Sequence, residues 1–285
     1  MFNNLNKVIK IFNKYTLIGI LFLILKKFKF IKYNSFIEKK KLKLEEQIIL
    51  LTKKTVVHGF YKGIQLNCKS SWGAGDYSSK LLGFYEMQVQ SKVIELQKKY
   101  NLRHLINFGT ADGYHLIGLT KNNYFESAFA YEIDAKERFN LKENLYLNNI
   151  NEKVKVFGKA DFDYIKNNLD YKKLENTLYL VDIEGEEFNL FNEKNLNEFY
   201  KSILIIENHD FFISDVLKKK SFFKLLEENF YLNFLYDGPR NPHNIPEIKN
   251  YKDDDKWLMV SEGRICNQDW LVCIPKSSSI KTRDV

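Results

Sequence analysis

The stretch Leu105-Ile-Asn-Phe-Gly109-Thr-Ala-Asp-Gly113-Tyr-His decides how this chain folds. Its apolar start has the composition of a buried strand, and the small residues that follow predict a tight turn into a helix. Some twenty residues later comes Ala130-Tyr-Glu132-Ile-Asp134, a second apolar strand that ends in an acid. A strand, a small-residue turn, a helix and an acid-tipped strand are the layout of a nucleotide-cofactor half-site in an α/β fold.

The spacing within the turn distinguishes between cofactors. A G-x-G-x-x-G frame would put its third small residue at Tyr114, whose ring would block close packing of the helix on the strand. The frame acid-x-G-x-G-x-G resembles the first motif of S-adenosylmethionine (SAM) methyltransferases, with its four places at Asn107, Gly109, Ala111 and Gly113. We expect both glycines to allow a sharp turn and a close approach to the ligand. Glu132 would accept hydrogen bonds from both ribose hydroxyls.

Strand and helix patterns alternate along the chain after about residue 55. We expect strands at 103–109, 127–133, 153–158, 177–183, 202–207, 231–236 and 270–274, and helices at about 80–99, 113–122, 135–148, 161–168, 187–199 and 214–228. This alternation predicts an α/β fold, a Rossmann-like, seven-stranded, mostly parallel sheet with helices on both faces. The final strand would be antiparallel, as in class I methyltransferases.

An irregular segment at 238–264 separates the last two predicted strands. It holds three of the four prolines of the chain. Long loops inside compact domains usually serve function, and proline stiffens them. We therefore expect 238–264 to be a lid or a substrate-binding loop.

Positive charge is concentrated at the N-terminus. The net charge of +8 comes from eleven Lys against three Glu in residues 1–50, so the remainder is neutral and predicts no groove for nucleic acid. Cys68, Cys266 and Cys273 form no C-x-x-C motif, which indicates neither a disulfide framework nor a zinc site. A reducing, cytoplasmic location is the expectation that follows.

We divide the chain into an N-terminal extension, residues 1–54, and a catalytic domain, residues 55–285. The extension contains nine largely apolar residues, 17–25, flanked by lysines. As a helix they would rise only about 14 Å, roughly half of a bilayer core. Two interpretations stay open: a basic, apolar helix packed on the domain or a partner, or peripheral contact of residues 1–50 with an anionic membrane surface.

Two further strands end in ionisable groups, namely Asp182-Ile-Glu184-Gly185-Glu-Glu187 and Ile206-Glu207-Asn-His209. The first resembles the D-x-E-G-x-E signature of FkbM-type SAM-dependent methyltransferases, and the second resembles the I-x-E-x-H strand of that family. Ala130-Tyr-Glu132, followed by Asn144 and Asn148, resembles its second motif. The resemblance covers about 103–210. It departs at Ile133, where the family usually has Pro, and at Asn107 and Ala111.

The resemblance implies a role for each motif. SAM would be held by Asn107, Gly109, Thr110, Ala111, Asp112, Gly113, Glu132, Ile133, Ala160, Asp161 and Asp182. His209 is the preferred base, because imidazole titrates near neutral pH, and Asp182 or Glu184 is the next choice. Candidate contacts to the substrate are Glu207, Arg240, His243 and Arg264.

Asp182, Glu184 and His209 could instead bind a divalent cation, because carboxylate and imidazole groups suit several metals. Because residues of a D-x-E strand alternate between faces, one carboxylate would point away, and the sequence therefore assigns no metal.

The leading hypothesis is an FkbM-type methyltransferase that acts on a hydroxyl of a sugar, glycan or secondary metabolite. One alternative is a nitrogen acceptor on a protein or small molecule. A second is a non-catalytic SAM-fold module at a membrane surface, and a third is an NAD-dependent enzyme. We also expect the Gly109→Val variant to lose SAM binding while it remains folded.

Overall fold

The computed structural model describes residues 36–69, 75–160, 176–264 and 268–276. Residues 44–285 form one compact unit, and residues 1–43 form another. Helix α3 (Phe36–Thr52) spans the division, and Leu44 and Ile48 of its second half are buried in the core of the larger unit. That unit thus begins inside the segment that we assign to the extension. The apolar stretch 17–25 lies outside the described residues.

No helix among the described residues is long and apolar enough to cross a membrane.

Seven strands form one sheet in the order β3-β2-β1-β4-β5-β7-β6. Their bounds are β1 (His104–Phe108), β2 (Ser127–Tyr131), β3 (Val154–Phe157), β4 (Thr177–Val181), β5 (Ile203–Glu207), β6 (Phe230–Leu235) and β7 (Trp270–Pro275). The first five run parallel, and β7 is antiparallel to both β5 and β6. This order with an antiparallel seventh strand is that of the Rossmann-like class I methyltransferase fold, so the expected fold class is confirmed.

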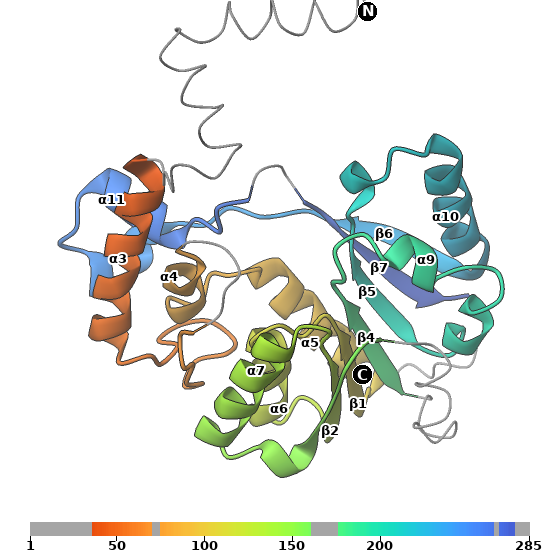
Figure 1. The fold of residues 1–285 in the computed structure, drawn as a ribbon, viewed down its shortest axis with the longest axis horizontal. Coiled ribbons are helices and arrows are strands. Elements are labelled where there is room, and N and C mark those ends of the chain that lie inside the picture. The colour runs from red at the N-terminus through yellow and green to blue at the C-terminus, as the bar shows by residue number, and fades with distance from the viewer. Residues whose placement is uncertain (1–35, 70–74, 161–175, 265–267, 277–285) are drawn as a thin grey trace, which may run out of the picture. The chain divides into compact units, whose positions relative to one another are not determined.

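The strands separate two apolar cores because successive side chains point to opposite faces. In β4, Leu178 belongs to one core and Tyr179 to the other. Helices α5 (Met87–Tyr100), α6 (Tyr114–Lys121) and α7 (Ala135–Leu147) supply the first core, whereas α9 (Glu187–Leu190) and α10 (Val216–Asn229) supply the second. Figure 1 shows these two sets of helices on either side of the sheet. Burial on both faces explains why residues 178–181 of β4 and 203–206 of β5 are apolar.

The strand order reverses between β1 and β4, because β2 and β3 extend the sheet one way and β5 the other. Ligands of open α/β sheets bind at such a switch point, beyond the carboxyl ends of the strands. Gly109, Glu132 and Asp182 directly follow β1, β2 and β4 and so meet at this edge.

The helix expected at 80–99 is broken in two. Helix α4 (Asp76–Leu81) ends before Gly83, and α5 begins after Glu86, which has a left-handed φ of 45°. Gly83 has a φ of 81°, and a Cβ there would lie 2.2 Å from the carbonyl oxygen of His58. Close contact with a remote segment therefore interrupts a run whose apolar spacing is helical throughout.

The helix expected at 187–199 is also shorter in the structure. Only α9 and a 3-10 turn at Leu196–Phe199 form. The side chain of Asn192 accepts hydrogen bonds from the backbone N–H groups of Lys194 and Asn195, which offers the chain an alternative to a helix. The helix expected at 161–168 lies outside the described residues.

The segment 238–264 is more ordered than an irregular loop. It contains two 3-10 turns and helix α11 (Asp253–Val260), and it buries Ile248 and Met259 in the first core. Three acids, Asp253 to Asp255, occupy the first turn of α11, where the helix dipole favours them. This helix-start signal was missed because the acids follow a proline-rich stretch.

Candidate functional site

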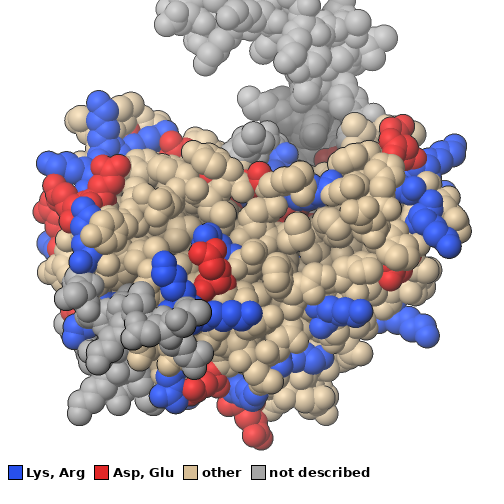
Figure 2. Space-filling view, turned by 180° about the vertical axis from the view of Figure 1, so that it is seen from behind, with Lys and Arg blue, Asp and Glu red and all other residues tan. Residues whose placement is uncertain are grey.

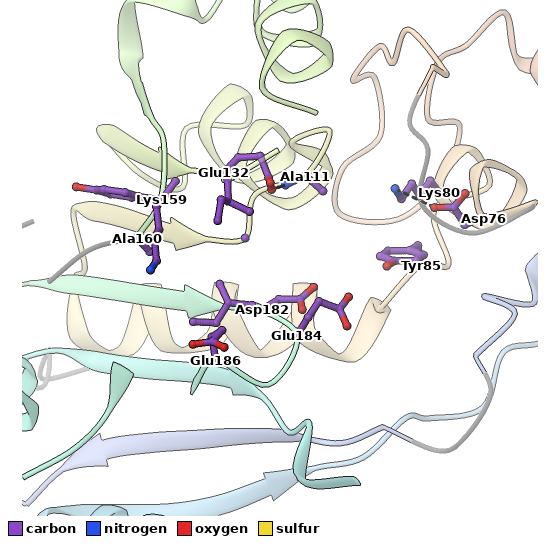
Figure 3. Close-up of a pocket in the computed structure, with 14 residues that line it drawn as sticks. Asp76, Lys80, Tyr85, Ala111, Glu132, Lys159, Ala160, Asp182, Glu184 and Glu186 are labelled. Atoms are coloured by element: carbon purple, nitrogen blue, oxygen red, sulfur yellow. Dashed lines mark hydrogen bonds and ion pairs between the residues drawn. The ribbon is translucent and has the colours of Figure 1, made fainter. Parts of the chain in front are cut away.

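A cavity of about 330 Å³ opens at the switch point of the sheet. Its volume lies within the range of about 300–1,000 Å³ that small-molecule sites occupy. It is lined by Asp76, Lys80, Tyr85, Gly109, Ala111, Tyr131, Glu132, Ile133, Lys159, Ala160, Asp182, Ile183, Glu184 and Glu186. Figure 3 shows Glu132 and Ala111 across the cavity from Asp182 and Glu184, with Lys80, Asp76 and Tyr85 farther along.

Glu132 joins the acid-tipped strand to the small-residue turn. Its buried carboxylate accepts hydrogen bonds from the backbone N–H groups of Ala111 and Asp134, each at 2.8 Å. A carboxylate has about four lone-pair sites, so two acceptor positions remain for a ligand in the cavity. Ala111, with a φ of 47°, holds the left-handed conformation that presents its N–H to Glu132.

The two glycines of the turn have a packing role that comes in addition to the expected approach to a ligand. A Cβ on Gly109 would lie 1.5 Å from the carbonyl oxygen of Asp182, and one on Gly113 would lie 2.4 Å from Cδ1 of Leu141. Gly109 also lines the cavity, whereas Gly113 is not among the residues that line it. These residues bring the turn against β4 and α7 and thereby shape the cavity indirectly.

A smaller cavity of about 50 Å³ adjoins the first and is lined by Asn107, Thr110 and Asp112, among others. The amide of Asn107 donates to the carbonyl of Leu180, and the hydroxyl of Thr110 donates to the carbonyl of Asn107. Both side chains thus hold the β1 end and its turn together. Of the expected cofactor residues, Ile133 and Ala160 line the larger cavity, and Asp161 lies outside the described residues.

Lys80 is a buried cation that no motif in the sequence marks. Its ammonium lies 3.1 Å from Asp76 Oδ2 and 3.2 Å from Asp112 Oδ2, and it faces the rings of Tyr77 and Tyr85. Burial alone would lower the pKa of Lys80, but Asp112 and Asp76 raise it well above its ordinary value. Asp76 Oδ1 is buried without a hydrogen-bond partner in the described part of the chain. The pair Lys80–Asp76 thus presents a charged donor and an unused acceptor.

The D-x-E-G-x-E stretch forms a turn directly after β4. Glu184 and Gly185 have left-handed φ values of 56° and 98°. The buried carboxylate of Glu187 accepts hydrogen bonds from the backbone N–H groups of Ile183 and Gly185, at 2.7 and 2.8 Å. Because the strand has already ended, Asp182 and Glu184 both line the cavity. The expectation that one of them faces away was wrong.

His209, the preferred base in the sequence-based hypothesis, is 1% exposed and does not line the larger cavity, whereas the second choices, Asp182 and Glu184, do line it. Its Nδ1 lies 3.2 Å from Glu187 Oε1, and its Nε2 faces the carboxylates of Glu207, Glu184 and Asp182. Burial alone would lower the pKa of His209, but Glu187 and Glu207 raise it. Burial and the neighbouring Glu207 raise the pKa of Asp182 well above its ordinary value.

The expected substrate residues fall into two groups. Glu207 and Arg264 form an ion pair at 2.5 Å beside His209, and Arg264 also contacts Glu86 and Glu262. In contrast, Arg240 pairs with Glu262 at 2.6 Å and Asp237 at 3.0 Å and lines a different, open pocket.

His243 also lies apart from the main cavity. It is half exposed, and its Nε2 lies 3.1 Å from Asp253.

On the face that Figure 2 shows, lysine and arginine side chains are interspersed with acids and wide uncharged areas.

No family model matches this chain, and no curated protein matches it. Among solved structures, it is similar to an O-methyltransferase from Bacillus cereus in complex with SAH, with 15% identity over 66% of this chain and 80% of that one and a TM-score of 0.47. It is similar to TomG from Streptomyces achromogenes, an O-methyltransferase involved in tomaymycin synthesis, in complex with SAM, with 10% identity over 67% and 81% of the two chains and a TM-score of 0.48. A putative O-methyltransferase from Klebsiella pneumoniae matches with 12% identity over 87% and 94% and a TM-score of 0.47.

Proposed function

We propose that this chain is a SAM-dependent methyltransferase of the FkbM type that methylates a hydroxyl of a sugar, glycan or secondary metabolite. The observation that carries this proposal is the cavity wall where Glu132 meets the backbone of Ala111, at the switch point of the sheet and opposite Asp182. The four motifs that resemble the FkbM family surround the same edge.

The residues that line the cavity fit the chemical groups of SAM. Glu132 offers acceptors for the ribose diol, and Ile133 and Ala160 offer apolar surface for a purine. Lys80 suits a carboxylate, and the unused oxygen of Asp76 suits an ammonium group. The cavity therefore matches an adenosine with a zwitterionic amino-acid tail.

When bound, SAM supplies a methyl group on a sulfonium, which becomes a thioether as an acceptor oxygen takes the methyl and loses its proton. The protein contributes mainly by alignment, which is worth on the order of 7–11 kcal/mol in well-oriented reactions. Glu184 is half exposed, lines the cavity and provides the carboxylate that takes the proton. A positioned base adds on the order of 10²–10⁴-fold to the rate.

Calorimetric titration with SAM tests the proposal. The wild-type chain should bind SAM. The Glu132→Gln variant should bind it about 10–100-fold more weakly, because hydrogen bonds to a charged group contribute about 1.5–3 kcal/mol. The matched control is Glu126→Gln, an exposed acid just before the opposite end of β2 that pairs with Arg103 on the surface. This control should bind SAM like the wild type.

Absence of binding at millimolar SAM would overturn the proposal and favour the non-catalytic module. Saturable binding of NADH in place of SAM would instead favour the dinucleotide enzyme. Transfer of labelled methyl from SAM to amines but not to hydroxyl compounds would move the proposal to a nitrogen acceptor.

A further inference from the structure

The environment of His209 is unusual for a buried histidine. Its ring is 1% exposed, and within the described residues its Nε2 has no hydrogen-bond partner. Nε2 lies 3.4 Å from Glu207 Oε2, 3.6 Å from Glu184 Oε2 and 3.8 Å from Asp182 Oδ1. Asp182 Oδ1 is likewise buried without a hydrogen-bond partner there. A ring nitrogen and several carboxylate oxygens therefore converge on one point.

Glu187 fixes which nitrogen of the ring faces that point. Two backbone N–H groups hold its carboxylate, and its Oε1 lies 3.2 Å from His209 Nδ1. A carboxylate at this distance accepts the Nδ1 proton and thereby turns Nε2 toward the point where the carboxylate oxygens meet. Several electron-rich atoms that converge in this way form an arrangement that a bound cation stabilises.

We propose that His209 Nε2, Asp182 Oδ1 and Glu207 Oε2 bind a divalent transition-metal ion at the edge of the cavity. Metal–ligand distances of about 2.0–2.2 Å separate neighbouring ligand atoms of a tetrahedral shell by about 3.4 Å, close to the observed 3.4 and 3.8 Å. Two of these ligands, Asp182 and His209, also belong to a set completed by Glu187 in which one ligand atom of each residue lies within 4.8 Å of the others.

Glu187 itself is better placed outside the metal shell. It faces Nδ1 rather than Nε2, and both of its oxygens already accept backbone hydrogen bonds. A histidine that binds a metal through one nitrogen almost always donates the other N–H to a carboxylate or carbonyl. Glu187 is therefore the positioning residue of a carboxylate–histidine–metal arrangement.

Charge favours the same conclusion. Arg264 pairs with Glu207 through Oε1, at 2.5 Å, which leaves Oε2 directed at His209. Four carboxylates surround His209, and the guanidinium of Arg264 pairs with only one of them, so negative charge is in excess at this mostly buried point. The four belong to Asp182, Glu184, Glu187 and Glu207. The mixture of imidazole and carboxylates suits Mn²⁺, Fe²⁺ or Zn²⁺ rather than a soft, thiolate-bound metal.

Asp182 connects this site to the cavity that it lines. A cation held by Asp182 would lie beside the cavity, where it would polarise the oxygen of an acceptor and lower the pKa of its hydroxyl. This use rests on the methyl transfer proposed above, whereas metal binding itself does not.

Titration with Mn²⁺ in the absence of SAM tests the site. Binding is measured as the loss of the electron paramagnetic resonance signal of the free ion. The full-length wild type should bind one Mn²⁺ per chain. His209→Ala and Asp182→Asn should each bind it at least about tenfold more weakly, and Glu187→Gln on the order of 10–100-fold more weakly. His104→Ala, a histidine at the opposite end of β1, should bind Mn²⁺ like the wild type.

Circular dichroism establishes that each variant is folded. If His209→Ala does not fold, Asp182→Asn decides, because this side chain is one-third exposed and tolerates the change better. Absence of Mn²⁺ and Zn²⁺ binding by the wild type at millimolar metal, or equal binding by wild type and Asp182→Asn, would overturn the site. Calorimetric titration with SAM distinguishes the two proposals. A chain that binds SAM but no metal overturns only the metal site, and a chain that binds metal but no SAM overturns only the methyl transfer.

Discussion

Gly109 has a packing role that its place in the motif does not predict. Its place in the motif predicts a close approach to a ligand, but the structure places the carbonyl oxygen of Asp182 where its Cβ would lie. The end of β1 and the end of β4 can approach each other only because this side chain is absent. Gly109→Val should therefore disrupt the fold itself, so the expectation that this variant stays folded and loses only SAM binding was wrong.

Gly109→Ala should destabilise the fold far more than Gly63→Ala, as measured by unfolding in urea. Both residues have left-handed φ values, 73° and 89°, so both substitutions carry similar backbone strain of about 1–2 kcal/mol. At Gly63 a Cβ would meet nothing within 4 Å, whereas at Gly109 it would meet backbone at 1.5 Å. Equal losses of stability in the two variants would contradict the packing role.

Residue identities at the site could be predicted better than their geometry. The motifs correctly indicated Gly109, Glu132, Ala160 and Asp182 as residues of one edge, because strand ends meet there. The burial of His209 and the presence of Lys80 could not be predicted, since both depend on contacts between segments distant in sequence. Lys80 lies before the first strand, where no recognised motif marked it.

At the scale of elements, the strands were predicted closely and the helices less well. Every expected strand forms within two residues of its predicted bounds, because buried strands are continuous apolar runs between turn signals. Helix breaks at Gly83 and Asn192 depend on a remote carbonyl and on a local side-chain hydrogen bond, which apolar spacing does not report. Helix α11 was missed because prolines precede it.

Three elements are joined by the ion pairs of Glu86, at the start of α5. Its carboxylate accepts a hydrogen bond from His115 on α6, at 2.6 Å, and pairs with Arg264 beyond α11. Arg264 in turn pairs with Glu207 at the end of β5. Burial would raise the pKa of Glu86, but the hydrogen bond from His115 and the charge of Arg264 lower it from 4.5 to about 2.

This pKa predicts how stability depends on pH. A carboxyl group with a lowered pKa in the folded state stabilises that state above its unfolded pKa and loses the contribution as the pH falls toward the folded value. Glu86→Gln should therefore cost on the order of 3 kcal/mol at neutral pH. The difference from the wild type should shrink from about pH 4.5 downward and disappear near pH 2. Urea unfolding at several pH values measures it, and a difference that stays constant would contradict the role of Glu86.

At the scale of the whole molecule, charge is divided between a lysine-rich N-terminus and a neutral remainder. Seven of the first eleven lysines lie in residues 1–35. Removal of residues 1–35 should lower the fraction of protein that sediments with anionic liposomes, since each lysine near such a surface contributes about 1 kcal/mol. The deletion stops there because Leu44 and Ile48 belong to the core of the domain.

Uncharged liposomes and high salt serve as controls, and neither should retain the full-length chain. An unchanged bound fraction after the deletion would exclude the membrane-surface role and leave the packed helix as the interpretation.

The contact between Glu86 and Arg264 joins residues 178 positions apart. During synthesis on the ribosome, the parallel strands β1 to β5 emerge well before Arg264 and β7. A nascent chain can therefore pair its central strands while Glu86 and Glu207 still lack their shared guanidinium. The ion pairs of Glu86 and Glu207 beside His209 can form only after Arg264 has been translated, so a chain that terminates before Arg264 would hold the parallel strands but would lack this network of ion pairs.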